Sequence, residues 1–184
     1  MSRLYRSMRT KLTANYRGQA MVEFAMGVTL MLIIMCACID FGRALNDVQV
    51  MADLTRQGSN LASRGTTLNE AAAAVVSGAS GLDLANHGNV IITSVTNENN
   101  VFKISGQDSS TTDGLTKLAA TSKIGSSVGA TATLPAAYTT STLQNGQTVY
   151  ITEVFFAFSA LTPIGALTNS AVSFPSTLYN AAYF

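Results

Sequence analysis

Charged residues are scarce in this chain, and their scarcity excludes several classes of protein. The 184 residues include 11 Lys and Arg and 10 Asp and Glu, or 11% in total, where an average globular domain carries about 25%. His87 is the single histidine and has no Asp and Ser arrangement beside it. The sequence also lacks metal-ligand clusters and the GxxxxGKS or GxxxxGKT motif of phosphate-binding loops. We therefore expect no catalytic residue, no metal and no cofactor.

Cysteine is almost absent as well. Cys36 and Cys38 are the only two, and they lie two positions apart within one apolar run. Residues at this spacing do not face each other on a helix. They cannot readily bond to each other, and we interpret them as small packing residues. The rest of the chain has no cysteine, so it must hold together without disulfides.

Acidic residues are missing from the first 18 positions, which makes the N-terminus strongly basic. Five bases precede Gly18, whereas six bases and ten acids follow it. A short basic flank beside an apolar run is a positive-inside signal, so we expect residues 1–18 to be a cytoplasmic leader. A nucleic-acid-binding arm is the alternative, but the chain has no second basic patch to support one. We therefore expect a membrane partner and no nucleic acid.

An apolar run follows the leader at once. Residues 20–39 are apolar except for Glu23, Gly27 and Thr29, and no proline interrupts them. A helix of this length spans about 30 Å, which is the thickness of the hydrocarbon core of a bilayer. We therefore predict one transmembrane helix. The residues expected at its far membrane interface are Asp40, Phe41, Gly42 and Arg43.

Glu23 is the unusual residue of the apolar run. A carboxylate inside a transmembrane helix costs up to about 3 kcal/mol and usually marks a function. A cut between Gly18 and Gln19 would create an α-amine with a pKa of about 8. This amine could pair with Glu23 of a neighbouring subunit and fix the register of the two helices. Glu23 could instead reach back to the cytoplasmic interface, and the residue alone does not decide between these alternatives.

Two other interpretations of the apolar run remain. A cleavable signal peptide, as in a secreted enzyme or lectin, needs a shorter core and a cleavage site of small residues, which residues 38–41 do not provide. An uncleaved signal anchor, as in a periplasmic scaffold or binding protein, explains the run. It explains neither Glu23 nor an 18-residue leader that ends in glycine.

Several blocks of residues together favour the cut after Gly18. A basic leader, a glycine, a glutamate five residues on and an apolar helix resemble the prepilin signal of type IV filaments. The whole series resembles the TadE-like minor pilins (pseudopilins) of the tight-adherence pilus, although Gly27-Val28-Thr29 replaces the early proline often found there. The blocks are Arg17-Gly18, Val22-Glu23-Phe24-Ala25, Asp40-Phe41-Gly42-Arg43-Ala44-Leu45 and Thr55-Arg56-Gln57-Gly58-Ser59. Weaker likenesses to the head of these proteins lie in Tyr150–Phe158, Leu161-Thr162-Pro163, Phe174-Pro175 and Tyr179–Phe184.

The resemblance implies a structural role without catalysis, as a priming or tip subunit of the pilus. A prepilin peptidase would cut between Gly18 and Gln19, and Glu23 and Phe24 would set the register against neighbouring subunits. The other implied partners are further minor pilins and the major pilin, with an inner-membrane platform protein and a secretion ATPase acting indirectly. The implied location is the bacterial inner membrane, with the N-terminus cytoplasmic and the head periplasmic. After assembly, the implied location is the base or the tip of the pilus.

The pattern beyond the apolar run predicts a long helix and a small head. Apolar residues continue at helical spacing, so we expect one transmembrane and stem helix over residues 19–65, with Gly65 as its stop. Residues 66–184 are expected to form a periplasmic α+β head. Thr67 and Glu70 resemble a capping box that opens a short helix ending near Val76.

Strand patterns fill the rest of the head. Residues 89–96 and 101–105 predict a hairpin, and residues 148–158 predict a further strand. A Ser/Thr/Gly-rich loop over about 106–148 lies between them, and a loop this long is usually functional or partly disordered. We predict a pilin-like α+β fold, in which the long N-terminal helix packs on one face of a small antiparallel sheet.

Overall fold

The chain forms two compact units. The computed structural model describes residues 2–138, 142–162 and 176–184, with side chains described from Gly18 onward. We call Met1–Gly42 with Ala160–Ser173 the anchor unit, and Arg43–Ser159 with Phe174–Phe184 the sheet unit. In the likenesses noted near the C-terminus, Pro163, Phe174 and Pro175 lie outside the described residues.

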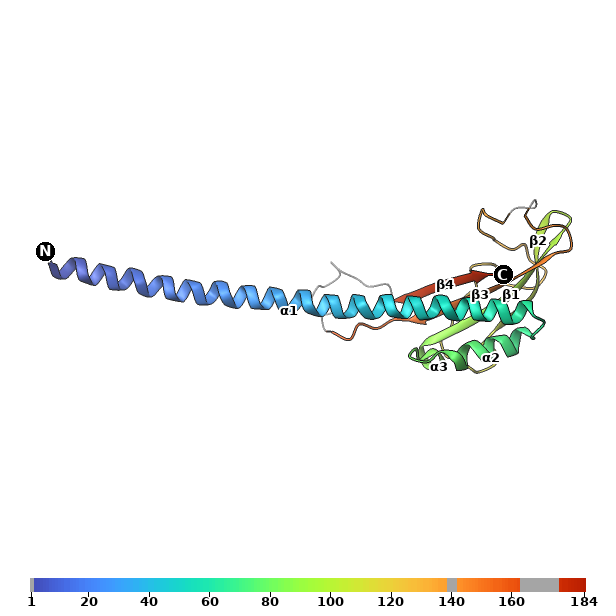
Figure 1. The fold of residues 1–184 in the computed structure, drawn as a ribbon, viewed down its shortest axis with the longest axis horizontal. Coiled ribbons are helices and arrows are strands. Elements are labelled where there is room, and N and C mark those ends of the chain that lie inside the picture. The colour runs from blue at the N-terminus through green and yellow to red at the C-terminus, as the bar shows by residue number, and fades with distance from the viewer. Residues whose placement is uncertain (1, 139–141, 163–175) are drawn as a thin grey trace. The chain divides into compact units, whose positions relative to one another are not determined.

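The longest element is α1, Ser2–Ser63 (Figure 1), and it contributes residues to both units. It begins at Ser2 and not at the predicted Gln19, because the leader contains neither proline nor an early glycine and is rich in the strong helix formers Arg, Leu and Met. The helix ends close to Gly65, whose φ is 93° and whose N–H donates to the Ala62 carbonyl at 3.2 Å. Among the described residues it is the one helix long and apolar enough to cross a membrane, and its most apolar 18-residue window has a mean hydropathy of 2.3.

Two short helices follow α1. The first is α2, Leu68–Gly78, and its capping box is confirmed. The Glu70 N–H donates to Thr67 Oγ1 at 3.3 Å, and the Thr67 backbone N–H donates to the Glu70 carboxylate at 3.4 Å. The second is α3, Leu84–His87, which begins where Asp83 accepts a hydrogen bond from the Asn86 N–H at 3.2 Å.

Four strands form one antiparallel sheet in the order β2-β1-β3-β4. Their bounds are β1 Gly88–Glu98, β2 Val101–Ser109, β3 Thr148–Ala157 and β4 Thr177–Tyr183. Asn99 and Asn100 turn the β1–β2 hairpin with φ values of 53° and 67°, the conformation that favours Asn in two-residue hairpin turns. The predicted hairpin and third strand are present, but β2 runs four residues into the predicted loop. The sequence predicts three or four strands but does not place the fourth, β4.

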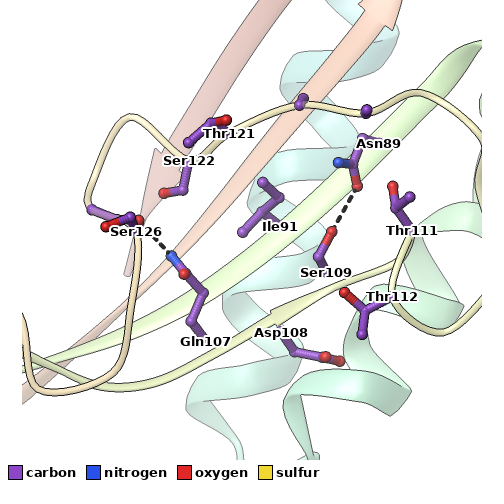
Figure 2. Close-up of a pocket in the computed structure, with 13 residues that line it drawn as sticks. Asn89, Ile91, Gln107, Asp108, Ser109, Thr111, Thr112, Thr121, Ser122 and Ser126 are labelled. Atoms are coloured by element: carbon purple, nitrogen blue, oxygen red, sulfur yellow. Dashed lines mark hydrogen bonds between the residues drawn. The ribbon is translucent and has the colours of Figure 1, made fainter.

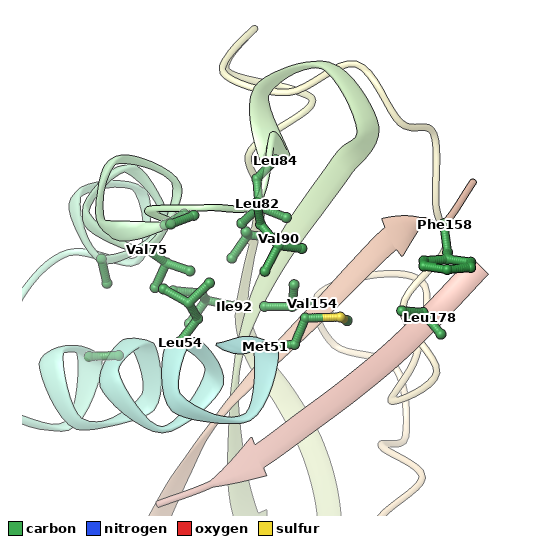
Figure 3. Packing of buried hydrophobic residues seen from close by; sticks show 14 residues of the cluster. Met51, Leu54, Val75, Leu82, Leu84, Val90, Ile92, Val154, Phe158 and Leu178 are labelled. Carbon is green, nitrogen blue, oxygen red and sulfur yellow. The ribbon is translucent and has the colours of Figure 1, made fainter. Parts of the chain in front are cut away.

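One face of the sheet packs against α1 and α2. Met51 and Leu54 of α1 meet Val75 of α2 and the strand residues Val90 and Val154, all at most 4% exposed (Figure 3). Their burial supplies the main hydrophobic stabilisation of this layer. The predicted α+β fold, with the long helix on a small antiparallel sheet, is confirmed.

The opposite face of the sheet is covered by the segment between β2 and β3. A second cluster joins the strand residues Val95, Ile104 and Ile151 to Ile124 and Ala132 of that segment. The same segment bonds to the outer edge of β2. The Ile104 N–H donates to the Ala130 carbonyl at 3.0 Å, and the Ala132 N–H donates to the Phe102 carbonyl at 2.8 Å. The described part of the Ser/Thr/Gly-rich loop therefore covers the hydrophobic core on this face of the sheet.

Gly58 and Ser59 bring α1 unusually close to the sheet. A Cβ atom on Gly58 would lie 2.8 Å from both Thr152 Oγ1 and Val75 Cγ2, so only glycine fits without a shift. Ser59 Oγ accepts a hydrogen bond from the Thr152 N–H at 3.0 Å and donates to the Ala182 carbonyl at 2.9 Å. Because Thr152 and Ala182 are paired across β3 and β4, the helix hydroxyl joins the ladder between these two strands.

Candidate functional site

The surface of α1 between Met21 and Ile39 is apolar and uncovered by any described residue. Its large side chains are each at least 41% exposed, and none of the most hydrophobic 18-residue window is buried. Exposed apolar area of this extent marks a membrane or protein contact. The side chains are Met21, Val22, Phe24, Met26, Val28, Leu30, Met31, Leu32, Ile33, Ile34, Met35 and Ile39.

Gly18, Gln19 and Glu23 lie within about one helical turn at the start of this surface. The Gln19 amide donates to the Glu23 carboxylate at 3.0 Å, and both side chains are exposed. A Cβ atom on Gly18 would meet no atom within 4 Å, so packing does not require glycine at this position. The structure thus places the predicted cleavage pair beside the predicted registration carboxylate.

Thr29 and Phe24 are further polar and aromatic residues on this surface. Thr29 Oγ1 donates to the Ala25 carbonyl of its own helix at 2.9 Å, which satisfies the hydroxyl within an apolar segment. Phe24 is 72% exposed and touches solvent on the same turn as Glu23. Glu23 is therefore the one described carboxylate along the apolar surface, and its single described partner is neutral.

Asp40 is buried, in contrast to its neighbours at the predicted membrane interface. Its carboxylate accepts hydrogen bonds from the Leu161 N–H at 2.9 Å, from the Thr162 N–H at 3.3 Å and from the Thr162 hydroxyl. The residue has no exposed surface, and hydrogen bonds to a charged group are among the stronger ones in proteins. Asp40 therefore fastens the segment after β3 to the helix within the anchor unit.

The remaining interface residues do not join Asp40. Phe41 is 57% exposed, and a Cβ atom on Gly42 would meet nothing within 4 Å. Arg43 is exposed one turn before Asp47. Burial raises the pKa of Asp47, and the positive charge of Arg43 opposes this rise. Only Asp40 of the predicted four-residue motif has an inward role.

Replacing Asp40 with alanine is expected to release the segment that it holds. Each lost hydrogen bond to a carboxylate is worth about 1.5–3 kcal/mol, so amide exchange at Leu161 and Thr162 should speed up about tenfold or more. Hydrogen exchange followed by mass spectrometry would measure this. The control is Asp53→Ala, because Asp53 is exposed and its one ion-pair partner among the described residues is Arg56, at 3.8 Å. Equal exchange in the two variants would contradict the role of Asp40.

Glu153 forms a second polar cluster that sequence reasoning missed. It lies in β3 with no exposed surface. Its carboxylate accepts hydrogen bonds from the Ser122 hydroxyl, from the Lys123 N–H at 2.9 Å and from the Tyr179 hydroxyl at 3.0 Å. The Lys123 ammonium lies 3.5 Å from the centre of the Tyr179 ring. Burial, together with the Glu153 carboxylate, raises the pKa of Tyr179.

The Glu153 cluster serves structure, because its acceptor atoms are already engaged. It ties the segment after β2 and the edge strand β4 to β3. The signal that could have found it is a lone glutamate inside the most apolar strand, because a buried carboxylate needs partners. Over the residues that the structure describes, no three His, Cys, Asp or Glu side chains lie together as a metal site would require.

Comparison with known proteins adds one finding. Residues 18–60 match the family model described as TadE-like protein. No curated protein and no solved structure matches the chain significantly. The matched segment begins at the predicted cleavage glycine, includes Glu23 and Asp40, and ends just beyond the Gly58-Ser59 contact with the sheet. Residues 18–60 of this chain are therefore similar to TadE-like proteins, which confirms the sequence resemblance over that segment.

Proposed function

We propose that this chain is a minor pilin of the tight-adherence pilus, with a structural role as a priming or tip subunit. The observation that carries the proposal is the exposed apolar surface of α1 with Glu23 near its start, within the segment that matches TadE-like proteins. Such a helix can lie in a bilayer or pack against other apolar helices. A pilus subunit must move from the bilayer into contact with the apolar helices of other subunits.

Cleavage after Gly18 would prepare the helix for this transfer. A peptidase needs extended backbone, whereas residues 2–63 are helical in the uncut chain. Glycine destabilises a helix by about 1 kcal/mol relative to alanine, so Gly18 is a position where the helix opens at low cost. The cut removes the basic leader and leaves an α-amine on Gln19.

The new amine gives Glu23 a charged partner. Among the described residues of the uncut chain, Glu23 accepts only from the neutral Gln19 amide. In a stack of subunits, the amine of one Gln19 can pair with Glu23 of the next subunit. Any other register of the two helices would leave both charges unpaired in an apolar environment, so the pair favours one register. Phe24 and its apolar neighbours would then pack in a defined position.

An uncleaved, membrane-anchored periplasmic scaffold or binding protein is the second candidate. The observation that favours it is the Gln19–Glu23 hydrogen bond, which gives the carboxylate a partner without any cut. In this case residues 1–18 stay attached, and α1 serves only to hold the sheet unit at the membrane. The two candidates differ in the mass of the mature chain.

Intact-mass analysis with and without a prepilin peptidase tests the proposal. We expect the mature chain to begin at Gln19 when the peptidase is present and at the unprocessed N-terminus when it is absent. Gly18→Leu should abolish processing, because a side chain would clash in the narrow cleft that holds extended backbone.

Gly27→Leu is the matched control for this experiment. A Cβ atom on Gly27, like one on Gly18, would meet nothing within 4 Å, so the two substitutions disturb the isolated chain equally little. Processing of Gly27→Leu should equal that of the wild type. A mature chain that keeps its leader in the presence of an active peptidase would rule out the minor-pilin proposal and leave the scaffold.

A further inference from the structure

A cavity of about 540 Å³ opens on the face of β1 and β2 that is opposite to α1. Its size falls within the range of about 300–1,000 Å³ typical of small-ligand sites. Ile91 forms an apolar floor, and the segment from Thr111 to Ser126 forms the outer wall (Figure 2). All of these residues belong to the sheet unit.

Asn89 presents a fixed hydrogen-bond donor to this cavity. Its Oδ1 accepts from the hydroxyls of Ser109 and Ser110, each at 3.1 Å. These bonds set the amide orientation and leave Nδ2 without a partner among the described residues. Figure 2 shows this nitrogen directed over Ile91, into the cavity. The residue is only 1% exposed, but Nδ2 is not among the fully buried atoms that lack a partner, so it can donate to water or to a ligand in the cavity.

Gln107 presents a fixed acceptor across the same floor. Its Nε2 donates to Thr93 Oγ1 at 3.0 Å and to the Gly125 carbonyl at 3.1 Å. Both amide hydrogens are used, so Oε1 is left to accept a hydrogen bond. The exposed hydroxyls of Thr112, Thr121 and Ser126 on the rim have no partner among the described residues and can donate or accept.

The groups that face the cavity are neutral. Asp108 contributes to the lining, but it is paired with Ile92 on the α2 side of the sheet, and Figure 2 shows its carboxylate directed away from Ile91. The two lysines within the wall segment, Lys117 and Lys123, are engaged elsewhere. Lys117 donates to Asn86 at 2.7 Å, and Lys123 lies over Tyr179. The site therefore offers no charge to select an ion.

We propose that this cavity binds a neutral saccharide of one or two rings. Amide and hydroxyl groups in fixed positions match sugar hydroxyls, each of which donates one and accepts up to two hydrogen bonds, and Ile91 suits the apolar face of a ring. A peptide strand fits less well, because strand addition needs a free sheet edge. The cavity lies over the face of β1 and β2, and the segment around Ala130–Ala132 already bonds the edge of β2.

Titration of the full chain with free sugars tests this proposal independently of any pilus role. The chain would be held in a zwitterionic detergent without a sugar headgroup. The probes are glucose, galactose, mannose, N-acetylglucosamine, lactose and chitobiose, with phosphate and trialanine as the charged and peptide alternatives. We expect at least one sugar to shift the side-chain amide resonance of Asn89 at millimolar concentration and to show saturation transfer.

Variants at the exposed rim connect the binding to the cavity. Thr121→Val should weaken the sugar about 2- to 10-fold through one lost hydrogen bond, and Thr121→Trp should fill the cavity and weaken binding more than tenfold. Val128→Trp is the control, because Val128 is 61% exposed and does not line the cavity. The thermal midpoint of each variant should equal that of the wild type.

Three results would overturn the proposal. The first is the absence of any sugar-induced shift at Asn89. The second is sugar binding that survives Thr121→Trp unchanged, which would place the ligand elsewhere. The third is tighter binding of phosphate or trialanine than of any sugar in the set.

Discussion

Replacing Gly58 with valine is expected to lower the free energy of unfolding of the sheet unit by about 3 kcal/mol. A Cβ atom at this position would lie 2.8 Å from Thr152 Oγ1 and from Val75 Cγ2, and 2.9 Å from Thr152 Cγ2. Both neighbours are β-branched and stiff at χ1, and both are fully buried. The helix must therefore move away from the sheet, which strains the nearby Ser59 hydrogen bonds to β3 and β4.

Urea denaturation of the full chain in detergent would measure the effect. Gly58→Ala should cost less than valine, because alanine gains about 1 kcal/mol of helix propensity that offsets part of the clash. Gly78 provides the matched control at the end of α2. A Cβ atom there would meet Gln57 Oε1 at 3.7 Å and Leu54 Cδ2 at 3.9 Å, which are ordinary contacts. If Gly58→Val and Gly78→Val had the same midpoint, close packing of α1 would not explain the glycine.

Replacing Glu23 with alanine is expected to abolish incorporation of the chain into pili while processing continues. The carboxylate lies at the start of an otherwise apolar surface and has one described partner, the Gln19 amide. Under the proposed function, loss of Glu23 leaves the Gln19 amine of a neighbouring subunit without its counter-charge, and removing one partner of a buried pair costs about 3–5 kcal/mol. A deficit of that size shifts assembly by more than a hundredfold. Intact mass and the amount of chain in sheared pili would report the two steps separately.

Three control variants separate charge from shape. Glu23→Gln keeps the size but loses the charge and should fail in the same way, whereas Glu23→Asp should retain part of the incorporation. Thr29→Val removes another polar group from the same helix, but its hydroxyl bonds only within the helix, so incorporation should be normal. Wild-type levels of Glu23→Ala in pili would refute the pairing of Glu23 with the amine.

Sequence patterns correctly predicted the structural features that depend on residues close together in the chain. The capping box at Thr67 and Glu70, the stop near Gly65 and the Asn99-Asn100 hairpin turn each depend on residues within four positions of one another. The strand β4 was missed for the opposite reason. Its alternation of Leu178, Tyr179 and small residues is weak, and it becomes a strand because β3 offers an unpaired edge.

The candidate sites likewise differ in whether their residues are close together or far apart in the sequence. Gly18, Gln19 and Glu23 could be proposed from the sequence because their order and spacing along one helix form the pattern, and the segment that matches the family model includes them. The inward role of Asp40 could not be recognised, because its partners Leu161 and Thr162 lie 121 and 122 positions away in the chain. Nothing in the residues around Asp40 indicates those contacts.

The sequence by itself determined that the chain has a basic N-terminal segment, a lipid-compatible helix with one carboxylate, and an α+β part without disulfides. These properties follow from composition and periodicity, which act over a few residues. Only the tertiary structure decided why Gly58 and Ser59 stand in the helix, which strand Glu153 joins to its neighbours, and where the cavity beside Asn89 opens. Each of these depends on side chains brought together from distant parts of the chain, and the free energy of such contacts exists only once the sheet has formed.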